Sequence, residues 1–405
     1  MLSVARDLDG ALAAGTTEHA LIPDLAEIAI VTDPAAIEAD WRAFDAVAVG
    51  HVFQSFDFLS PWLAHVGRER AISPRVVVGR DRAGEMLFLL PFGIRRCLGS
   101  WLLEWLGGEH ADYHCGLYAP RFLAALGADT RLAGALRATV IGLFKGEADL
   151  VSFRRQPVEI AGLANPFAGF AAIPHSAMSH LTRLGGDWEA YYRAKRNSSS
   201  RRNDRSKRQK MEASGPVRFI DAETPAEVRR VTAALFSQKT ESLAAQGIPN
   251  IFASPAVRAF YAALALKPFP RGPSHVAAIE CGGEVVATNW GLVRGDRYYY
   301  VMHSYAGGEI GRTSPGRHLM YHLMQWCIAR RIGLFDFTIG DEEFKSQWCE
   351  ESTPLFDSVA ALRARGAWMA ATLRVGKYLK RTVKNNQTLW MLAGYVRRWR
   401  SMMVR

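Results

Sequence analysis

Apolar and polar positions alternate along this chain with two periods, one typical of strands and one typical of helices. The runs HVAAIEC, EVVATNWGLV and RYYYVMHSY are rich in β-branched and aromatic residues and predict three strands. Glycine-containing turns separate them, so 275–305 is predicted to form a three-stranded meander. Apolar positions at helical spacing then predict an amphipathic helix over 317–331. The strand-like run Leu334–Ile339 follows and ends at Gly340.

The first half of the chain shows a similar alternation of strand-like and helix-like segments. It includes a predicted hairpin that turns at Asp81–Gly84 and a predicted helix at Thr130–Phe144. This order predicts an α/β fold with mixed sheets, in two domains of similar length. The predicted parts are a polar lead-in 1–24, an N-terminal domain 25–175, a C-terminal domain 176–365 and a basic helical tail 366–405.

The composition is that of a globular protein, because 49% of its 405 residues are apolar and 22% are charged. Its start lacks a basic segment followed by an apolar one, and no apolar run reaches the roughly 18 residues of a spanning helix. Five cysteines without a CxxC pair do not favour a disulfide framework or a zinc site. A reducing cytoplasm is therefore predicted, with no metal.

The net charge of +11 is concentrated in two segments. From Ser358 to the C-terminus there are eleven Lys and Arg and no acid, so the rest of the chain holds equal numbers of bases and acids. A second cluster, RAKRNSSSRRNDRSKRQK at Arg193–Lys210, has nine bases and one acid. Localised basic segments on a neutral body predict anionic partners at those places.

The turn GRTSPGR, Gly311–Arg317, has the features of a phosphate-binding helix start. Ser314 is a favoured N-cap residue, and Pro315 suits the first helical position. Gly316 removes side-chain bulk where backbone N–H groups point at an anion. Arg312 and Arg317 flank the turn as forked phosphate donors. A plain capped helix with two surface arginines would have the same sequence.

The segment YYYVMHSY…TSPGRHLMYHLMQWCIARRIGLFDFTIGDEEFKSQW resembles the BioF2-like acetyltransferase domain of the CelD/BcsL family. That family is linked to cellulose and other exopolysaccharide synthesis, and it shows an SPG turn, a helix and a D-F-x-x-G-x-x-x-[YF]-K-x-x-W strand. The resemblance covers roughly residues 25–360, and through VFQSFDFLSPWL, LPFGIRR and WLGGEHADYH it reaches the first half. It places the chain in the GNAT superfamily and near the FemAB-like aminoacyltransferases, which use two tandem GNAT-type domains.

The resemblance implies that Leu334–Ile339 lies beside the strand 298–305, and that the two splay apart around the thioester of acetyl-CoA or a longer acyl-CoA. The residues after Gly340 would then lie near the acyl group, with Asp341 or Glu342 as a base and Lys345 stabilising negative charge or binding phosphate. Asp336, inside the strand, is a further candidate for the chemistry. His303 and Tyr305 are two apart in the strand 297–305 and so share a face, where either could bind substrate or act as an acid or donor, or simply pack. The resemblance adds Asp112 and Tyr113 as implied substrate-binding residues.

Three functions fit these observations. The first is an acyl-CoA-dependent N-acyltransferase acting on an amino sugar of an exopolysaccharide or lipid-linked precursor at the inner face of the inner membrane. The second is a FemAB-like aminoacyltransferase that uses aminoacyl-tRNA. Nucleic acid is not favoured, because aromatic residues do not interleave with the bases of Arg193–Lys210. The third is a GNAT-derived scaffold or regulator without catalytic activity.

The tail from Gly366 carries two stripes at helical spacing. Trp368, Val375 and Leu379 form an apolar one, while Arg374, Lys377, Arg381 and Lys384 form a basic one. A basic amphipathic helix with tryptophans suits an anionic membrane surface. Packing on its own domain, or binding of an anionic nucleotide, would use the same pattern.

Overall fold

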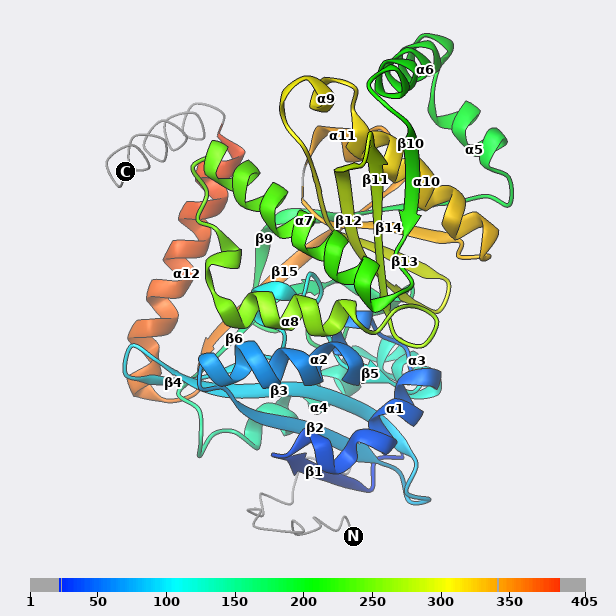
Figure 1. Ribbon diagram of the computed structural model, residues 1–405. Coiled ribbons are helices and arrows are strands. Elements are labelled where there is room, and N and C mark those ends of the chain that lie inside the picture. Colours follow the sequence, from blue (N-terminus) through cyan, green and yellow to red (C-terminus); the bar gives the residue numbers. More distant parts are fainter. Residues whose placement is uncertain (1–21, 23, 341, 387–405) are drawn as a thin grey trace. The chain divides into compact units, whose positions relative to one another are not determined.

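The structure is a computed structural model that describes residues 22, 24–340 and 342–386 (Figure 1). Its contacts divide the chain into two compact units. Of the described residues, unit 1 comprises 22, 24–177 and 353–386, and unit 2 comprises 178–340 and 342–352. Two strands, β9 (Ala172–Arg183) and β15 (Glu351–Ala361), carry the chain from one unit into the other.

Unit 1 contains a mixed sheet in the order β1-β2-β3-β4-β6-β15. Neighbours are antiparallel except β4 and β6, which run parallel. The strands are β1 (Glu27–Val31), β2 (Ser73–Arg80), β3 (Met86–Cys97), β4 (Ser100–Trp105), β5 (Leu117–Tyr118) and β6 (Leu150–Pro157). The short strand β5 pairs with β3. Strands β7 (Glu159–Ile160) and β8 (Leu163–Ala164) form a separate small hairpin. The helices are α1 (Glu38–Val47), α2 (Phe56–Trp62), α3 (Pro120–Ala128), α4 (Thr130–Gly142) and α12 (Ala364–Asn385).

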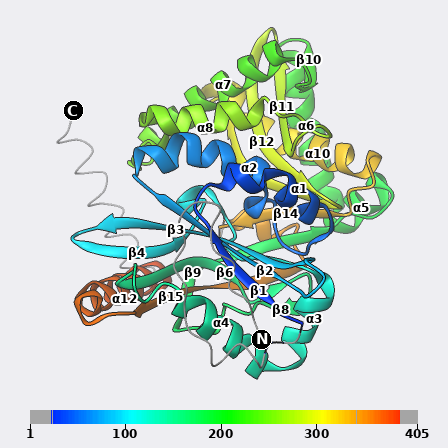
Figure 2. The same ribbon diagram turned by 90° about the horizontal axis from the view of Figure 1, so that it is seen from below.

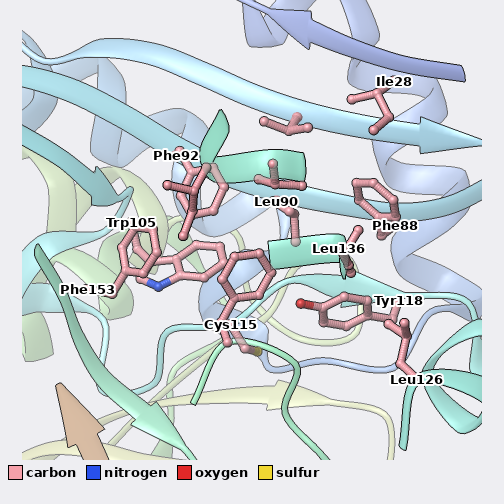
Figure 3. Close-up of a cluster of buried hydrophobic side chains, with 14 of the residues drawn as sticks. Ile28, Phe88, Leu90, Phe92, Trp105, Cys115, Tyr118, Leu126, Leu136 and Phe153 are labelled. Carbon is pink, nitrogen blue, oxygen red and sulfur yellow. The ribbon is translucent and has the colours of Figure 1, made fainter. Parts of the chain in front are cut away.

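The main core of unit 1 lies between the sheet and helices α3 and α4. Phe92, Trp105 and Phe153, from three neighbouring strands, stack with ring centroids 4.2 to 5.1 Å apart (Figure 3). Leu126 of α3 and Leu136 of α4 belong to the same buried cluster. Because successive strand residues point to opposite faces, Leu102 and Leu150 face the other way, where α12 packs against β4 and β6 (Figure 2).

The strands of unit 2 follow the order β9-β14-β13-β12-β11-β10, which is also mixed. Its strands are β10 (Val217–Asp221), β11 (Ser274–Cys281), β12 (Glu284–Arg294), β13 (Arg297–Tyr305) and β14 (Leu334–Ile339). Its helices are α5 (Trp188–Lys195), α6 (Ser198–Ala213), α7 (Pro225–Ala245), α8 (Pro255–Ala265), α9 (Gly308–Arg312), α10 (Pro315–Ala329) and α11 (Glu343–Ser346). The predicted meander is confirmed, since β11, β12 and β13 pair antiparallel in sequence.

Helices α7 and α10 cover opposite faces of this meander. Thr288 of β12 donates a hydrogen bond to Gln238 of α7, whereas its neighbour Ala287 belongs to the buried cluster around Leu323 of α10. Adjacent strand residues point to opposite faces, so the two helices lie on different sides. Figure 1 shows α7 running along the strands.

The predicted α/β class is confirmed, and the two units share one element order. Each has a strand, two helices, three antiparallel strands, further helices and a parallel strand, with β4 beside β6 in unit 1 and β13 beside β14 in unit 2. The contact boundary differs from the predicted boundary at Arg365. Leu355–Ala361 of β15 pairs with β6, and α12 follows it, so both belong to unit 1.

No helix within the described ranges is long and apolar enough to cross a membrane.

Candidate active site in the second unit

Strands β13 and β14 pair in parallel over only three residue pairs, from Arg297 with Leu334 to Tyr299 with Asp336. Beyond this point β13 continues to Tyr305 without β14 beside it. A cavity of about 200 Å³ opens there. The predicted adjacency and splaying of these strands are therefore confirmed.

The cavity is lined by β13, by the turn into α10 and by the segment around α11. Its lining residues are Tyr300, His303, Tyr305, Gly311, Ser314, Gly316, Arg317, Met320, Phe344, Gln347 and Trp348. Tyr300 and His303 stack with ring centroids 4.8 Å apart, although residues three apart in a regular strand point to opposite faces. A register shift in the β12–β13 pairing, opposite Tyr300, brings them to the same side.

The turn into α10 differs from the predicted one. Ser314 lies in the left-handed region (φ 59°, ψ 50°), and its side chain makes no capping hydrogen bond, so the prediction of an N-cap interaction is wrong. The hydroxyl Oγ instead accepts a hydrogen bond of 2.7 Å from Lys207 Nζ of α6. Pro315 occupies the first helical position as predicted. The N–H of Gly316, in the first helical turn, is one of the donors that an α-helix cannot satisfy internally.

Helix α6 is tied to α10 through Asp204, whose side chain is buried. The carboxylate accepts hydrogen bonds of 2.8 Å from the hydroxyls of Tyr192 and Tyr321, and it forms an ion pair of 3.1 Å with Arg317. Burial raises the pKa of Asp204, but these hydrogen bonds and the charge of Arg196 lower it overall. The carboxylate is therefore ionised and orients Arg317 at the cavity wall.

Positive charge gathers at the N-terminus of α10. The pKa of His318 is lowered to about 4, mainly by burial and also by the charges of Arg208, Arg317 and Lys207, while Asp204 opposes the lowering. His318 Nε2 is buried and has no hydrogen-bond partner within the described part of the chain. The start of α10 at Gly316, the guanidinium of Arg317 on the cavity wall and Lys207 bonded to Ser314 make this end of the cavity suitable for an anionic group.

His303 is the imidazole on the cavity wall. Burial lowers its pKa to about 3, the charges of Lys239 and Lys345 contribute to the lowering, and Glu342 opposes it. Lys239 Nζ of α7 also donates a 3.3 Å hydrogen bond to the backbone carbonyl of His303. The imidazole is thus neutral at physiological pH and offers one N–H donor and one acceptor.

Glu342 and Lys345 form an ion pair beside the cavity, but they are not among its lining residues. Lys345 is 3% exposed, and its Nζ lies 2.9 Å from Glu342 Oε2 and 3.0 Å from the carbonyl of Ile339. A Cβ at Gly340 (φ 138°) would lie 2.3 Å from Glu342 Oε2 and 2.8 Å from Lys345 Nζ. The positive φ favours glycine here, and a side chain would displace the ion pair from this position.

Asp336 has a structural role in β14. It is buried, lies 3.4 Å from Arg297, and accepts a 2.8 Å hydrogen bond from the backbone N–H of Thr338. Thr338 has a φ of 57°, at a register shift in the pairing with β9. Asp336 stabilises this bulge. Asp341 lies outside the described residues.

Five of the predicted binding residues meet at one place. Tyr305, His303, Gly316 and Arg317 line the cavity together with Ser314, whereas Arg312 is exposed at the end of α9 and does not line it.

Asp112 and Tyr113 lie in unit 1. Asp112 is buried and lies 3.4 Å from Arg155, and Tyr113 packs on the ring of His51 at 4.6 Å. Their predicted role in substrate binding stays a prediction.

Several cavity residues were not identified from the sequence. Tyr300, Phe344 and Gln347 lie within the quoted family segment, but nothing in the pattern separates them from core residues. Lys207 does not line the cavity but donates to Ser314, which does. The sequence indicated it only through the charge of Arg193–Lys210, which forms part of α5 and most of α6. Within the described residues no group of three or more His, Cys, Asp and Glu side chains could hold a metal ion.

Comparison with known proteins places the site in a recognised domain. Residues 198–346, from α6 to α11, match the family described as an acetyltransferase (GNAT) domain. The chain is similar in fold to the crystal structure of FemX, with a TM-score of 0.57, 11% identity, and coverage of 82% of this chain and 97% of that chain. It is also similar to a conserved protein of unknown function from Bacteroides thetaiotaomicron VPI-5482, with a TM-score of 0.50, 11% identity, and coverage of 83% and 100%. No curated protein matches the chain.

Unit 2 therefore contains a GNAT-type domain, and the candidate site lies within it. Membership of the CelD/BcsL family stays a prediction.

Proposed function

We propose that unit 2 transfers an acyl group from acyl-CoA to an amine. The observation that supports this most is the single cavity that has an open, positively charged helix start at one end and a neutral imidazole on its wall. An open, positively charged helix start is what binding of a pyrophosphate needs. A carbonyl oxygen that gains negative charge during acyl transfer needs a hydrogen-bond donor, such as the neutral imidazole of His303.

The phosphate end of the site would use three groups of this chain. The N–H of Gly316 and the dipole of α10 favour an anion, and Lys207 Nζ and the Arg317 guanidinium flank it. A Cβ at Gly316 would lie 3.0 Å from Tyr305 Cδ1, so glycine keeps space between the helix start and β13.

The reacting end would use His303 as a neutral donor. In the reaction the amine nitrogen bonds to the acyl carbon, the carbon–sulfur bond breaks, and the thiolate leaves with the proton that the amine loses. His303 donates to the carbonyl oxygen while it carries negative charge, and the nearby positive charges of Lys239 and Lys345 stabilise the same charge. A neutral imidazole donor needs no proton transfer of its own.

We place the acceptor among amino sugars of exopolysaccharide or lipid-linked precursors, reached at the inner face of the membrane. This part of the proposal rests on the resemblance of residues 25–360 to the CelD/BcsL family. The basic, acid-free helix α12 is compatible with an anionic surface.

A transfer assay tests the proposal. The purified protein with acetyl-CoA and a panel of amino sugars is expected to release free thiol in an amine-dependent way. Lys207→Met should raise the KM for acetyl-CoA roughly tenfold and leave kcat unchanged, because a charge-assisted contact of about 1.5 kcal/mol is lost from binding. Lys210→Met, an exposed lysine on the same helix, is the matched control. Equal KM values in the two variants would remove Lys207 from the donor site.

A FemAB-like aminoacyltransferase is the second candidate. Arg202, Arg205 and Lys210 are exposed on α6, where they could contact an anionic polymer. In the same assay, deacylation of aminoacyl-tRNA without thiol release from any acyl-CoA would favour this function. Absence of both reactions would favour a scaffold.

A further inference from the structure

Unit 1 contains a second cavity, of about 360 Å³, between its sheet and α12. Residues of β3, β4, β6, β9 and β15 line one side of it, and Met369 to Lys380 of α12 line the other. Figure 2 shows α12 beside this part of the sheet. Ligand sites of proteins are typically cavities of about 300 Å³ or more, so this one has the size of a binding site.

Part of the cavity wall is apolar. Leu102 and Leu150 of the sheet and Met369 of α12 form a small buried cluster, and Leu373 packs against it. All four also line the cavity. This wall would contact the apolar body of a ligand.

The other part of the wall carries an excess of positive charge. Four cations line the cavity, Arg95, Arg154, Lys377 and Lys380, against two carboxylates, Glu104 and Asp357. Arg95 lies 2.7 Å from Glu104, and Lys377 lies 2.5 Å from Asp357, so each carboxylate is already paired. Among the described residues, Arg154 forms no ion pair.

Asp357 has no remaining capacity for Arg154. Its carboxylate also accepts a 2.9 Å hydrogen bond from the backbone N–H of Arg155 and contacts His175 Nδ1 at 3.0 Å. Burial raises the pKa of Asp357, yet the hydrogen bond with His175 and the charge of Lys377 hold it well below its usual range. Both carboxylates of the wall are thus paired with other cations, and an anionic ligand would complement Arg154.

We propose that this cavity binds a phosphate-bearing ligand with an apolar body. Its phosphate contacts Arg154 and the lysines of α12, and its body lies on Leu102, Leu150 and Leu373. The same chemistry occurs in two kinds of molecule, a nucleoside diphosphate and an isoprenoid diphosphate. This site lies in unit 1, so its occupation does not depend on the activity proposed for unit 2.

Calorimetric titration of the full-length protein tests this site with three probes, farnesyl diphosphate, UDP and inorganic pyrophosphate. We expect one of the two organic diphosphates to bind at least roughly tenfold more tightly than pyrophosphate. Pyrophosphate has no organic body that could contact the apolar wall. Tighter binding of farnesyl diphosphate would identify a lipid carrier as the source, and tighter binding of UDP a nucleotide. No saturable binding of either, or equal binding of pyrophosphate, would overturn the proposal.

Two variants with matched controls assign the binding to this cavity and not to the phosphate turn of unit 2. Arg154→Gln should weaken the affinity roughly tenfold or more, since a charge-assisted contact is lost, whereas Arg82→Gln, in the exposed turn after β2, should not. Gly376→Phe places a ring at a cavity-lining position with no atom within 4 Å of the new Cβ, and should abolish binding. Gly376→Ala should retain it. Affinities unchanged in both Arg154→Gln and Gly376→Phe would contradict the proposed site.

Discussion

Asp204→Ala is expected to lower the free energy of unfolding by about 3 to 5 kcal/mol, the range measured when one partner of a buried ion pair is removed. The carboxylate is 3% exposed and serves Tyr192, Tyr321 and Arg317 at once. Its loss leaves a guanidinium without its counter-ion and two hydroxyls without their acceptor. Chemical denaturation followed by tryptophan fluorescence and circular dichroism measures the change.

The same variant should weaken acyl-CoA binding, because Asp204 holds α6 against the start of α10 and so positions Lys207. Asp204→Asn is the matched control, since the amide oxygen still accepts from the tyrosine hydroxyls. It should recover a part of the stability but not the orientation of Arg317. A loss of less than about 1 kcal/mol in Asp204→Ala, typical of an exposed ion pair, would contradict the role given to this carboxylate.

His303→Ala is expected to lower kcat about 10²- to 10³-fold, the usual cost of removing one donor to a developing oxyanion. The KM for acyl-CoA should change little, because the phosphate end of the cavity is intact. His303→Gln keeps an N–H donor of similar reach and should retain more activity than the alanine variant. Equal activity of wild type and His303→Ala would exclude the imidazole from the reaction.

The pH profile distinguishes donation from base catalysis. The pKa of His303 is lowered to about 3, so the imidazole is neutral, and able to donate, at every pH above that value. Between pH 5 and pH 9 the kcat of wild type should therefore show no inflection that disappears in His303→Gln. An inflection near pH 6.5 that does disappear would show that His303 titrates at its ordinary pKa and acts as a base.

Local sequence patterns predicted those helices, strands and turns that depend on residues close together in the sequence. The hairpin at Asp81–Gly84 forms, and Pro315 occupies the first position of α10. Both depend on residues close in sequence. The pairing of β15 with β6 joins residues some 200 positions apart, and no local pattern specifies such a contact.

The difference between local and long-range contacts also explains which residues of the candidate site were predicted. His303 and Tyr305 could be paired from their spacing, because alternate strand residues share a face. Tyr300 could not, since it reaches their side through a shift of register between two strands. Ser314 has the residue type of an N-cap, but a lysine on α6 takes its hydroxyl. Lys345 and Asp336 have the residue types of catalysis, and each bonds to nearby backbone: Lys345 donates to the carbonyl of Ile339, and Asp336 accepts from the N–H of Thr338. Their predicted roles in the chemistry stay predictions.

The central claim, that the start of α10 holds the donor, is tested most directly by calorimetric titration of acetyl-CoA into wild type and Gly316→Leu. The Leu side chain would crowd Tyr305 and cover the first-turn N–H, whereas Gly307→Leu, where a Cβ has no atom within 4 Å, is the matched control. The account predicts saturable binding in wild type and Gly307→Leu and a loss of affinity of at least roughly tenfold in Gly316→Leu. Equal affinity in all three proteins, or no binding by wild type, would contradict it.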